Sequence, residues 1–237
     1  MKRTFILVVG MAIVLVCSMQ AHAALQNLGT DSLGNRLIYD TDLDITWYDY
    51  THSYDPNIGR ADWDYHKNWA ENELSVTFGS NVYTDWRMPT TVDGTYVWGY
   101  DGSTTAGFNI TSSEMGHLFY TELGNEGYLD TSGNTTGCSV SYPFCLTNTG
   151  PFQNLLSGGY WSGTEVSDDN DPSVNNYAWY FGTGDGSQGK EAKGVGGNAL
   201  AVRPGLAVVP EPISSILFVV GGATLGFRRF WKKRKTV

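Results

Sequence analysis

Cysteine is scarce in this chain of 237 residues, which has only three. Cys17 falls in an apolar N-terminal stretch, so Cys138 and Cys145 are the two that remain for the rest of the sequence. Two cysteines exclude the dense disulfide framework of very small secreted domains. We expect one disulfide between Cys138 and Cys145, which closes a small loop and stabilises the fold by about 2.5 kcal/mol.

Positive charge is equally scarce between residues 24 and 208. This part has seven Lys and Arg against 23 Asp and Glu, a formal net charge of about −16, whereas the whole chain carries −9. Nucleic acids bind by phosphate neutralisation through Lys and Arg, so a nucleic-acid partner is excluded. Divalent cations and neutral or cationic glycans are compatible with such a surface.

Signatures of catalysis are also missing. The histidines after the N-terminal stretch, His52, His66 and His117, have no metal-ligand spacing, and the sequence contains neither H-E-x-x-H nor G-x-S-x-G. The G-x-G-x-x-G match at residues 184–189 lies between predicted strands with no helix after it, which is typical of a chance match. We therefore expect a protein that is not an enzyme, with a polysaccharide hydrolase as the weakest alternative.

Long apolar runs occur only near the two ends of the chain. At the N-terminus, Lys2 and Arg3 precede an apolar stretch over residues 5–16, and Ala21-His22-Ala23 matches an A-x-A cleavage site. This pattern predicts a signal peptide over residues 1–23 and export by the Sec machinery.

The other run follows a proline-rich motif and precedes a basic cluster. Residues 213–227 are apolar, and the arrangement resembles the PEP-CTERM sorting signal over residues 209–237, with a transmembrane helix over about 213–231. The resemblance implies recognition by an exosortase, a membrane anchor before cleavage, and an extracellular or cell-surface product afterwards. Fifteen residues at about 1.5 Å each fall short of a hydrocarbon core of about 30 Å, but snorkelling arginines leave a permanent tail anchor as the alternative. The sorting and processing residues are Val209, Pro210, Glu211, Pro212, Arg228 and Arg229.

Residues 24–208 predict one α+β domain. Strand patterns at 36–39 and 45–48 flank an acidic turn and predict a hairpin. Two helices are expected, one over about 62–74 and one from a capping box at 111–114 to Gly124. Later strands at 159–162, 177–181 and 199–204 predict a twisted antiparallel sheet.

Four segments, at residues 85–90, 159–165, 178–181 and 201–204, resemble the successive signatures of the Lcl C-terminal domain family. The resemblance implies a C-type-lectin-like fold and an extracellular setting. The family's name-giving adhesin binds sulfated glycans, whereas the acidic charge of this domain disfavours them. We expect the tryptophans of these signatures to pack in the core, and Arg87 and Arg203 to pair with Asp85 or Glu165. The signature residues are Trp86, Arg87, Pro89, Trp161, Ser162, Glu165, Trp179, Arg203 and Pro204.

Two acidic clusters are candidate calcium sites. Asp40, Asp42 and Asp44 alternate, which on a strand points three carboxylates to one side. Asp168, Asp169 and Asp171 form a second cluster of hard oxygen donors before a proline. Solvated acidic turns remain the alternative for both clusters, and calcium is the one cofactor considered.

Tyr96, Trp98 and Tyr100 alternate in a glycine-containing segment. Such a row of rings can stack on sugars, while a packed hairpin is the alternative. Together these features predict a non-catalytic extracellular module associated with a glycan or an exopolysaccharide matrix. A structural matrix protein without a specific ligand is the second hypothesis.

Overall fold

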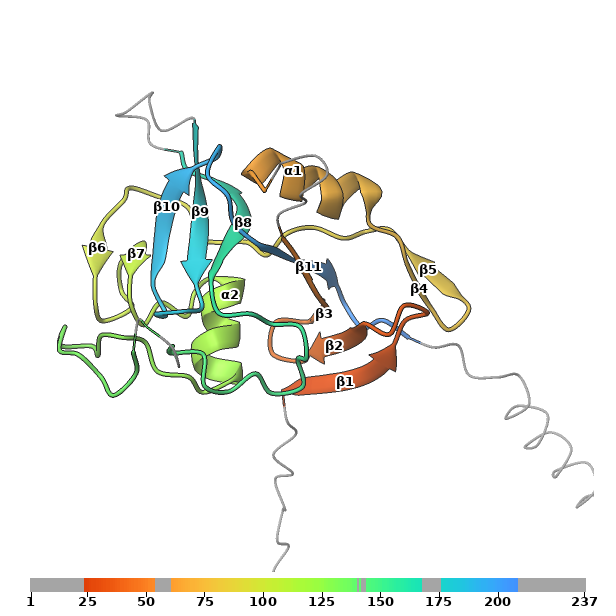
Figure 1. The fold of residues 1–237 in the computed structure, drawn as a ribbon, viewed down its shortest axis with the longest axis horizontal. Coiled ribbons are helices and arrows are strands. Elements are labelled where there is room, and N and C mark those ends of the chain that lie inside the picture. Colours follow the sequence, from red (N-terminus) through yellow and green to blue (C-terminus); the bar gives the residue numbers. More distant parts are fainter. Residues whose placement is uncertain (1–23, 54–60, 140, 142–143, 168–175, 209–237) are drawn as a thin grey trace, which may run out of the picture.

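The computed structural model describes residues 24–53, 61–139, 141, 144–167 and 176–208. It has a mixed α+β fold with two short helical segments and mainly antiparallel sheets, which confirms the α+β part of the prediction (Figure 1). The predicted signal peptide and the predicted sorting helix lie outside these residues. Within the described ranges, no helix is both long enough and apolar enough to cross a bilayer.

The first sheet joins the beginning and the end of the described chain. It contains β1 (Leu25–Thr30), β2 (Arg36–Asp40), β3 (Ile45–His52) and β11 (Ala199–Pro204) in the order β1-β2-β3-β11, all antiparallel. The β2–β3 hairpin coincides with the predicted one. The sequence did not predict β1, because its side chains are exposed or only half-buried and show no clear alternation of apolar and polar residues.

A second sheet has the order β6-β7-β10-β9-β8. Its strands are β6 (Trp98–Gly99), β7 (Ala106–Gly107), β8 (Gly159–Glu165), β9 (Tyr177–Gly182) and β10 (Gln188–Ala192). The β6–β7 pair is parallel and the other pairs are antiparallel. A separate small hairpin joins β4 (Val76–Phe78) and β5 (Asn81–Tyr83).

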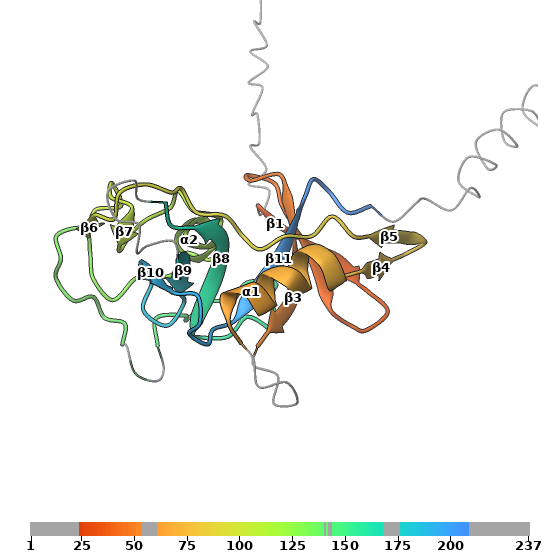
Figure 2. The same cartoon turned by 90° about the horizontal axis from the view of Figure 1, so that it is seen from above.

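The sequence predicted one late sheet, and the structure has two sheets side by side (Figures 1 and 2). The strand at 199–204 pairs with β3, not with the strands that precede it in the chain, and Val202 lies opposite Trp47. The two sheets meet where the Trp161 amide donates to the Asn198 carbonyl at 2.8 Å. Alternation within a strand shows that the strand exists but not which neighbour it pairs with.

The first helical segment comprises α1 (Trp63–Asn68) and a π-helical continuation η1 (Trp69–Glu73). It begins where the Asp62 side chain caps the Tyr65 amide at 3.0 Å. Trp63, His66, Trp69 and Ala70 are buried. These bounds agree with the predicted helix over about 62–74.

The second helical segment comprises α2 (Glu114–Gly116) and the π-helical η2 (His117–Glu122), and the chain turns at Gly124 with φ +62°. The predicted capping box beginning at Thr111 is wrong. Ser113 is the N-cap, and its Oγ accepts from the Gly116 amide at 3.0 Å. Glu114 therefore occupies the first helical position, where its carboxylate is free to face another segment.

The core divides into two large clusters and one small one. Trp86 and Trp161 belong to the cluster beneath α1, and Trp179 belongs to the small cluster beside Tyr96. These three tryptophans expose 3%, 2% and 0% of their surface. Their large apolar area thus stabilises packing.

Candidate functional site

Arg87 is a structural link between distant segments. Its Nη1 and Nη2 donate to the two carboxylate oxygens of Glu114, both at 2.7 Å. Its backbone forms an isolated bridge with Val202 in β11. The sequence predicted Asp85 or Glu165 as the partner, which is wrong because the start of α2 brings Glu114 to this guanidinium.

Arg203 forms a second bidentate pair. Nε and Nη2 donate to the Asp85 carboxylate at 2.9 and 3.0 Å, and the guanidinium lies 4.5 Å from the centre of the Tyr83 ring. These hydrogen bonds from Arg203 hold the pKa of the Asp85 carboxyl below its usual value. Glu165 instead binds Lys193, with Nζ and Oε2 2.7 Å apart.

The remaining signature residues also connect backbone segments. The Ser162 hydroxyl donates to the Pro89 carbonyl at 3.0 Å, and the Ser162 carbonyl accepts from Trp63 Nε1 at 2.7 Å. Pro204 ends β11 opposite Ile45. The residues of the segments at 85–90 and 159–165 therefore connect the two sheets and α1.

The acidic triplet forms a turn, so the predicted alignment of three carboxylates along a strand is wrong. β2 ends at Asp40, whose buried carboxylate accepts from the amides of Asp42 and Leu43 at 3.1 and 3.0 Å and from Trp47 Nε1 at 3.3 Å. Asp44 adopts a left-handed backbone, with φ +51°, and accepts from the Tyr39 hydroxyl at 2.7 Å. The cluster at Asp168, Asp169 and Asp171 lies outside the described residues.

Tertiary contacts bring Asp40 together with His117 and Glu122 instead. One potential ligand atom from each lies within 4.8 Å of the others, and His117 Nε2 is 3.0 Å from Glu122 Oε1. Burial, followed by the charge of Asp40, raises the pKa of Glu122. One imidazole and two carboxylates suit Zn²⁺ or Mn²⁺ better than Ca²⁺, which takes six to eight oxygens. The one local signal for this cluster is the five-residue spacing of His117 and Glu122, which a π-helical turn brings together.

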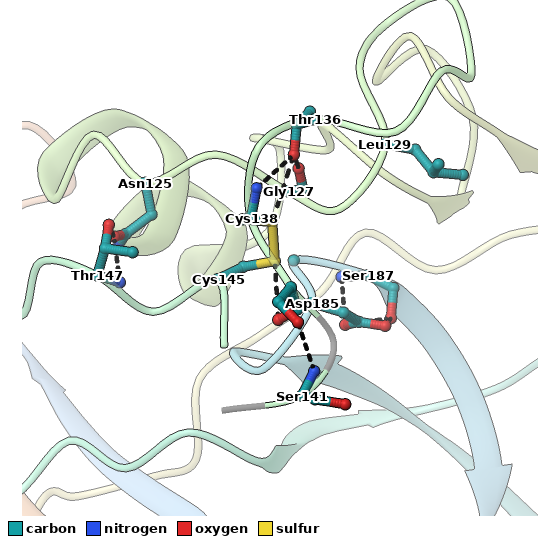
Figure 3. The surroundings of a disulfide bond; sticks show 12 residues. Asn125, Gly127, Leu129, Thr136, Cys138, Ser141, Cys145, Thr147, Asp185 and Ser187 are labelled. Carbon is teal, nitrogen blue, oxygen red and sulfur yellow. Dashed lines mark hydrogen bonds between the residues drawn. A yellow bond between two sulfur atoms is a disulfide. The ribbon is translucent and has the colours of Figure 1, made fainter. Parts of the chain in front are cut away.

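The disulfide joins Cys138 and Cys145, whose Cα atoms are 4.9 Å apart. Figure 3 shows the bond beside Asp185 and Ser187 of the β9–β10 turn. The Cys145 amide donates to the Gly184 carbonyl at 3.0 Å, which fixes the disulfide loop to that turn. The disulfide is therefore a local crosslink at one end of the second sheet.

Tyr96, Trp98 and Tyr100, which we call the aromatic strip, lie at the β6 edge of the second sheet. Trp98 and Tyr100 expose 46% and 41% of their surface. Both pack on Phe108, with ring centroids 5.9 and 6.5 Å away, and Tyr96 stacks on buried Trp179 at 6.1 Å. The strip thus has supported rings whose outer surfaces reach solvent, and the predicted alternative of a hairpin is replaced by a parallel β6–β7 pair.

A cation lies close to the strip in this otherwise acidic domain. Lys190 Nζ is 5.0 Å from the centre of the Tyr96 ring and 5.5 Å from that of Tyr177. The Asp93 carboxylate accepts a hydrogen bond from Trp179 Nε1 at 2.8 Å. Burial raises the pKa of Tyr96, so this phenol stays neutral over the physiological range.

Two histidines without sequence spacing also meet in the core. The Nδ1 atoms of His52 and His66 are 2.8 Å apart, and His66 Nε2 lies 2.9 Å from the Gly197 carbonyl. This hydrogen-bond pattern assigns the Nε2–H tautomer to neutral His66, whose Nδ1 then accepts from His52. His52 stacks on Trp69 with centroids 4.2 Å apart.

This pair predicts acid-sensitive stability. Burial lowers the pKa of His66 below its usual value, so the unfolded chain takes up this proton at a higher pH than the folded chain. The contribution of neutral His66 is full above about pH 6.5 and is lost as the pH falls through the folded-state pKa. We expect a lower Tm at about pH 5 than at about pH 7.5, measured by thermal unfolding. His66→Gln should have a smaller Tm difference, and an unchanged difference would refute this origin.

Comparison of the chain with protein-family models, with curated proteins and with solved structures finds no match.

Proposed function

We propose that residues 24–208 form a non-catalytic saccharide-binding module with a C-type-lectin-like fold. The observation that carries the proposal is the exposure of Trp98 and Tyr100 on a rigid support. Aromatic rings with one free face stack on the C–H faces of sugars, and rings that are already ordered lose little entropy on binding. The acidic charge of the domain favours neutral or cationic saccharides over sulfated ones.

We further propose that the chain is an exported substrate of an exosortase. The N-terminal pattern of residues 1–23 and the motif at 209–212 support this proposal, together with the basic cluster after the apolar run. In this scheme the module is membrane-anchored first and then reaches the exterior or the cell surface. A saccharide of the surrounding matrix is the partner that this location makes available.

Binding to immobilised neutral and sulfated polysaccharides, with calcium or with a chelator, tests the module. We expect retention on a neutral matrix and about a tenfold weaker affinity for Trp98→Ala, since one lost stacking contact of about 1.4 kcal/mol corresponds to that factor. Tyr100→Ala should act in the same direction. Isothermal titration with a soluble oligosaccharide from the retained polysaccharide gives the affinities.

Val97→Ala is the matched control, because Val97 is also exposed, at 49%, but brings no ring. It should bind like the wild type. Unchanged affinity of Trp98→Ala and Tyr100→Ala would reject the aromatic strip. Absence of retention on every polysaccharide would favour a structural matrix protein, and turnover of a polysaccharide would favour a hydrolase.

A further inference from the structure

The two faces of the second sheet differ in what covers them. Side chains alternate along β9, so Trp179 and Phe181 point to one face and Tyr180 points to the other. Phe181 packs on Phe119 of η2, with ring centroids 5.5 Å apart. Tyr180 remains partly exposed at the edge of the cluster beneath α1.

Glycine surrounds Tyr180 on the neighbouring strands. A Cβ on Gly189 of β10 would lie 3.1 Å from the Tyr180 ring, and a Cβ on Gly159 of β8 would lie 3.8 Å from it. The ring therefore lies across the two strands, close to their backbones. Larger residues at these positions would cover the ring or displace it.

Two hollows flank this ring, with volumes of about 200 and 360 Å³. Both are lined by Gly159 and Tyr180, so they adjoin at these two residues, and we call the two hollows together the Tyr180 groove. Trp161 and Glu191 line one end, and Asp185 with Ser187 lines the other. The larger volume falls at the lower end of small-ligand pockets, about 300–1,000 Å³, and the smaller hollow extends it.

Trp161, which lines the first of the two hollows, carries a buried hydrogen-bond donor without an acceptor. Trp161 exposes 2% of its surface, and its Nε1 has no hydrogen-bond partner among the described residues. A Cβ on Gly197, which lines the same hollow, would lie 2.7 Å from this nitrogen. An indole N–H that is buried and unpaired has lost its hydrogen bond to water without a replacement, so such groups in folded proteins have a specific explanation.

Acceptors stand at both ends of the groove. The Asp185 carboxylate accepts from the Ser187 amide and hydroxyl at 2.9 and 2.8 Å, which holds it in place. Glu191 Oε1 accepts from the Ala192 amide at 2.9 Å. Each carboxylate has further lone pairs that can accept from ligand hydroxyls. Two carboxylates in a strongly acidic domain repel anions, so a sulfated or uronic saccharide does not fit.

We propose that the Tyr180 groove binds a neutral saccharide. A pyranose ring stacks on Tyr180, Trp161 Nε1 donates to a sugar oxygen, and Glu191 and Asp185 accept from sugar hydroxyls. This inference rests on the proposed saccharide-binding function and adds a second contact surface, on the sheet face away from Trp179 and the aromatic strip.

The test titrates the full chain, in detergent, with neutral hexasaccharides of glucose, galactose and mannose, and with a sulfated hexasaccharide as the charge comparison. Gly159→Val places a side chain in both hollows, while its Cβ meets Tyr180 at an ordinary 3.8 Å. We expect at least a tenfold loss of affinity for a neutral hexasaccharide. Gly137→Val is the control, because a Cβ there meets nothing within 4 Å.

A spectroscopic readout at Trp161 separates this site from the strip. With ¹⁵N-labelled tryptophan, the Trp161 indole N–H resonance should shift downfield and exchange more slowly when the hexasaccharide binds, in the wild type and in Trp98→Ala alike. If Gly159→Val fails to fold, the shift of the Trp161 resonance in the wild type still tests whether the saccharide binds in the groove. The proposal that the groove binds a saccharide is wrong if the Trp161 resonance does not move, or if a folded Gly159→Val keeps full affinity. It is also wrong if the protein prefers the sulfated hexasaccharide.

The failures are distinguishable. If Trp98→Ala weakens binding and Gly159→Val does not, the proposed saccharide-binding function is kept and the Tyr180 groove is rejected as a binding site. No binding of any saccharide by the wild type removes both.

Discussion

Trp179→Ala is expected to lower the free energy of unfolding by about 3–5 kcal/mol, the range for removing a large aromatic residue from a core. Trp179 is 0% exposed, stacks on Tyr96 and donates from Nε1 to Asp93. The substitution leaves a cavity, and it also leaves the Asp93 carboxylate without this donor. Urea unfolding followed by far-UV circular dichroism measures the change.

Trp98→Ala is the matched control for this experiment, since it removes the same side chain from a site that is 46% exposed. Its expected cost is below about 1 kcal/mol, because much of the ring surface is already in water. Comparable costs at the two positions would contradict the assignment of one tryptophan to the core and the other to a ligand surface. The contrast therefore tests the division between architecture and function directly.

Replacing Pro210, Glu211 and Pro212 together by alanine is expected to abolish C-terminal processing in a host with an exosortase. The substitution removes the motif while leaving the apolar run and the basic cluster in place, so the chain should stay in the membrane fraction at its uncleaved mass. Wild-type protein should appear outside the cell, shortened near residue 212. Intact-mass spectrometry of the membrane and extracellular fractions gives the result.

Ser214→Ala with Ser215→Ala changes the same region without touching the motif, and it should be processed normally. Cleavage of the triple-alanine variant would show that the motif is not what the protease reads. If the wild type stays uncleaved in such a host, the result would favour the alternative that residues 209–237 are a permanent membrane anchor, with Arg228 and Arg229 at the interface.

Local features of the fold are readable from the sequence. Asp62 and the spacing of Trp63, His66 and Trp69 predict the first helix, because a cap and a 3.6-residue period are properties of one segment. The β2–β3 hairpin and the end of the second helix at Gly124 follow from equally local patterns. The buried tryptophans follow from their size and their place on strands.

The sequence predicted the partner of Arg203 correctly as Asp85, but not the partner of Arg87. Ser113, Ser112 and Thr111 are chemically similar caps, and the chain uses Ser113, which turns Glu114 toward Arg87. Any of several carboxylates could pair with the Arg87 guanidinium, so sequence spacing alone could not identify Glu114 as its partner. The same holds for Asp40, whose neighbours His117 and Glu122 arrive from a distant helix.

The sequence by itself determined the composition of this protein: an acidic, cysteine-poor domain with alternating rings at 96–100, an apolar N-terminal run after two cations, and a C-terminal Pro-Glu-Pro motif with a basic tail. Tertiary structure alone decided that Trp98 and Tyr100 stay exposed while Trp179 is buried, and that Trp161 and Tyr180 meet a groove lined by glycines of several segments. The physical reason is that periodicity and capping act within a few residues of the chain. Sheet pairing and side-chain partners depend on which distant segments the collapsed chain brings together.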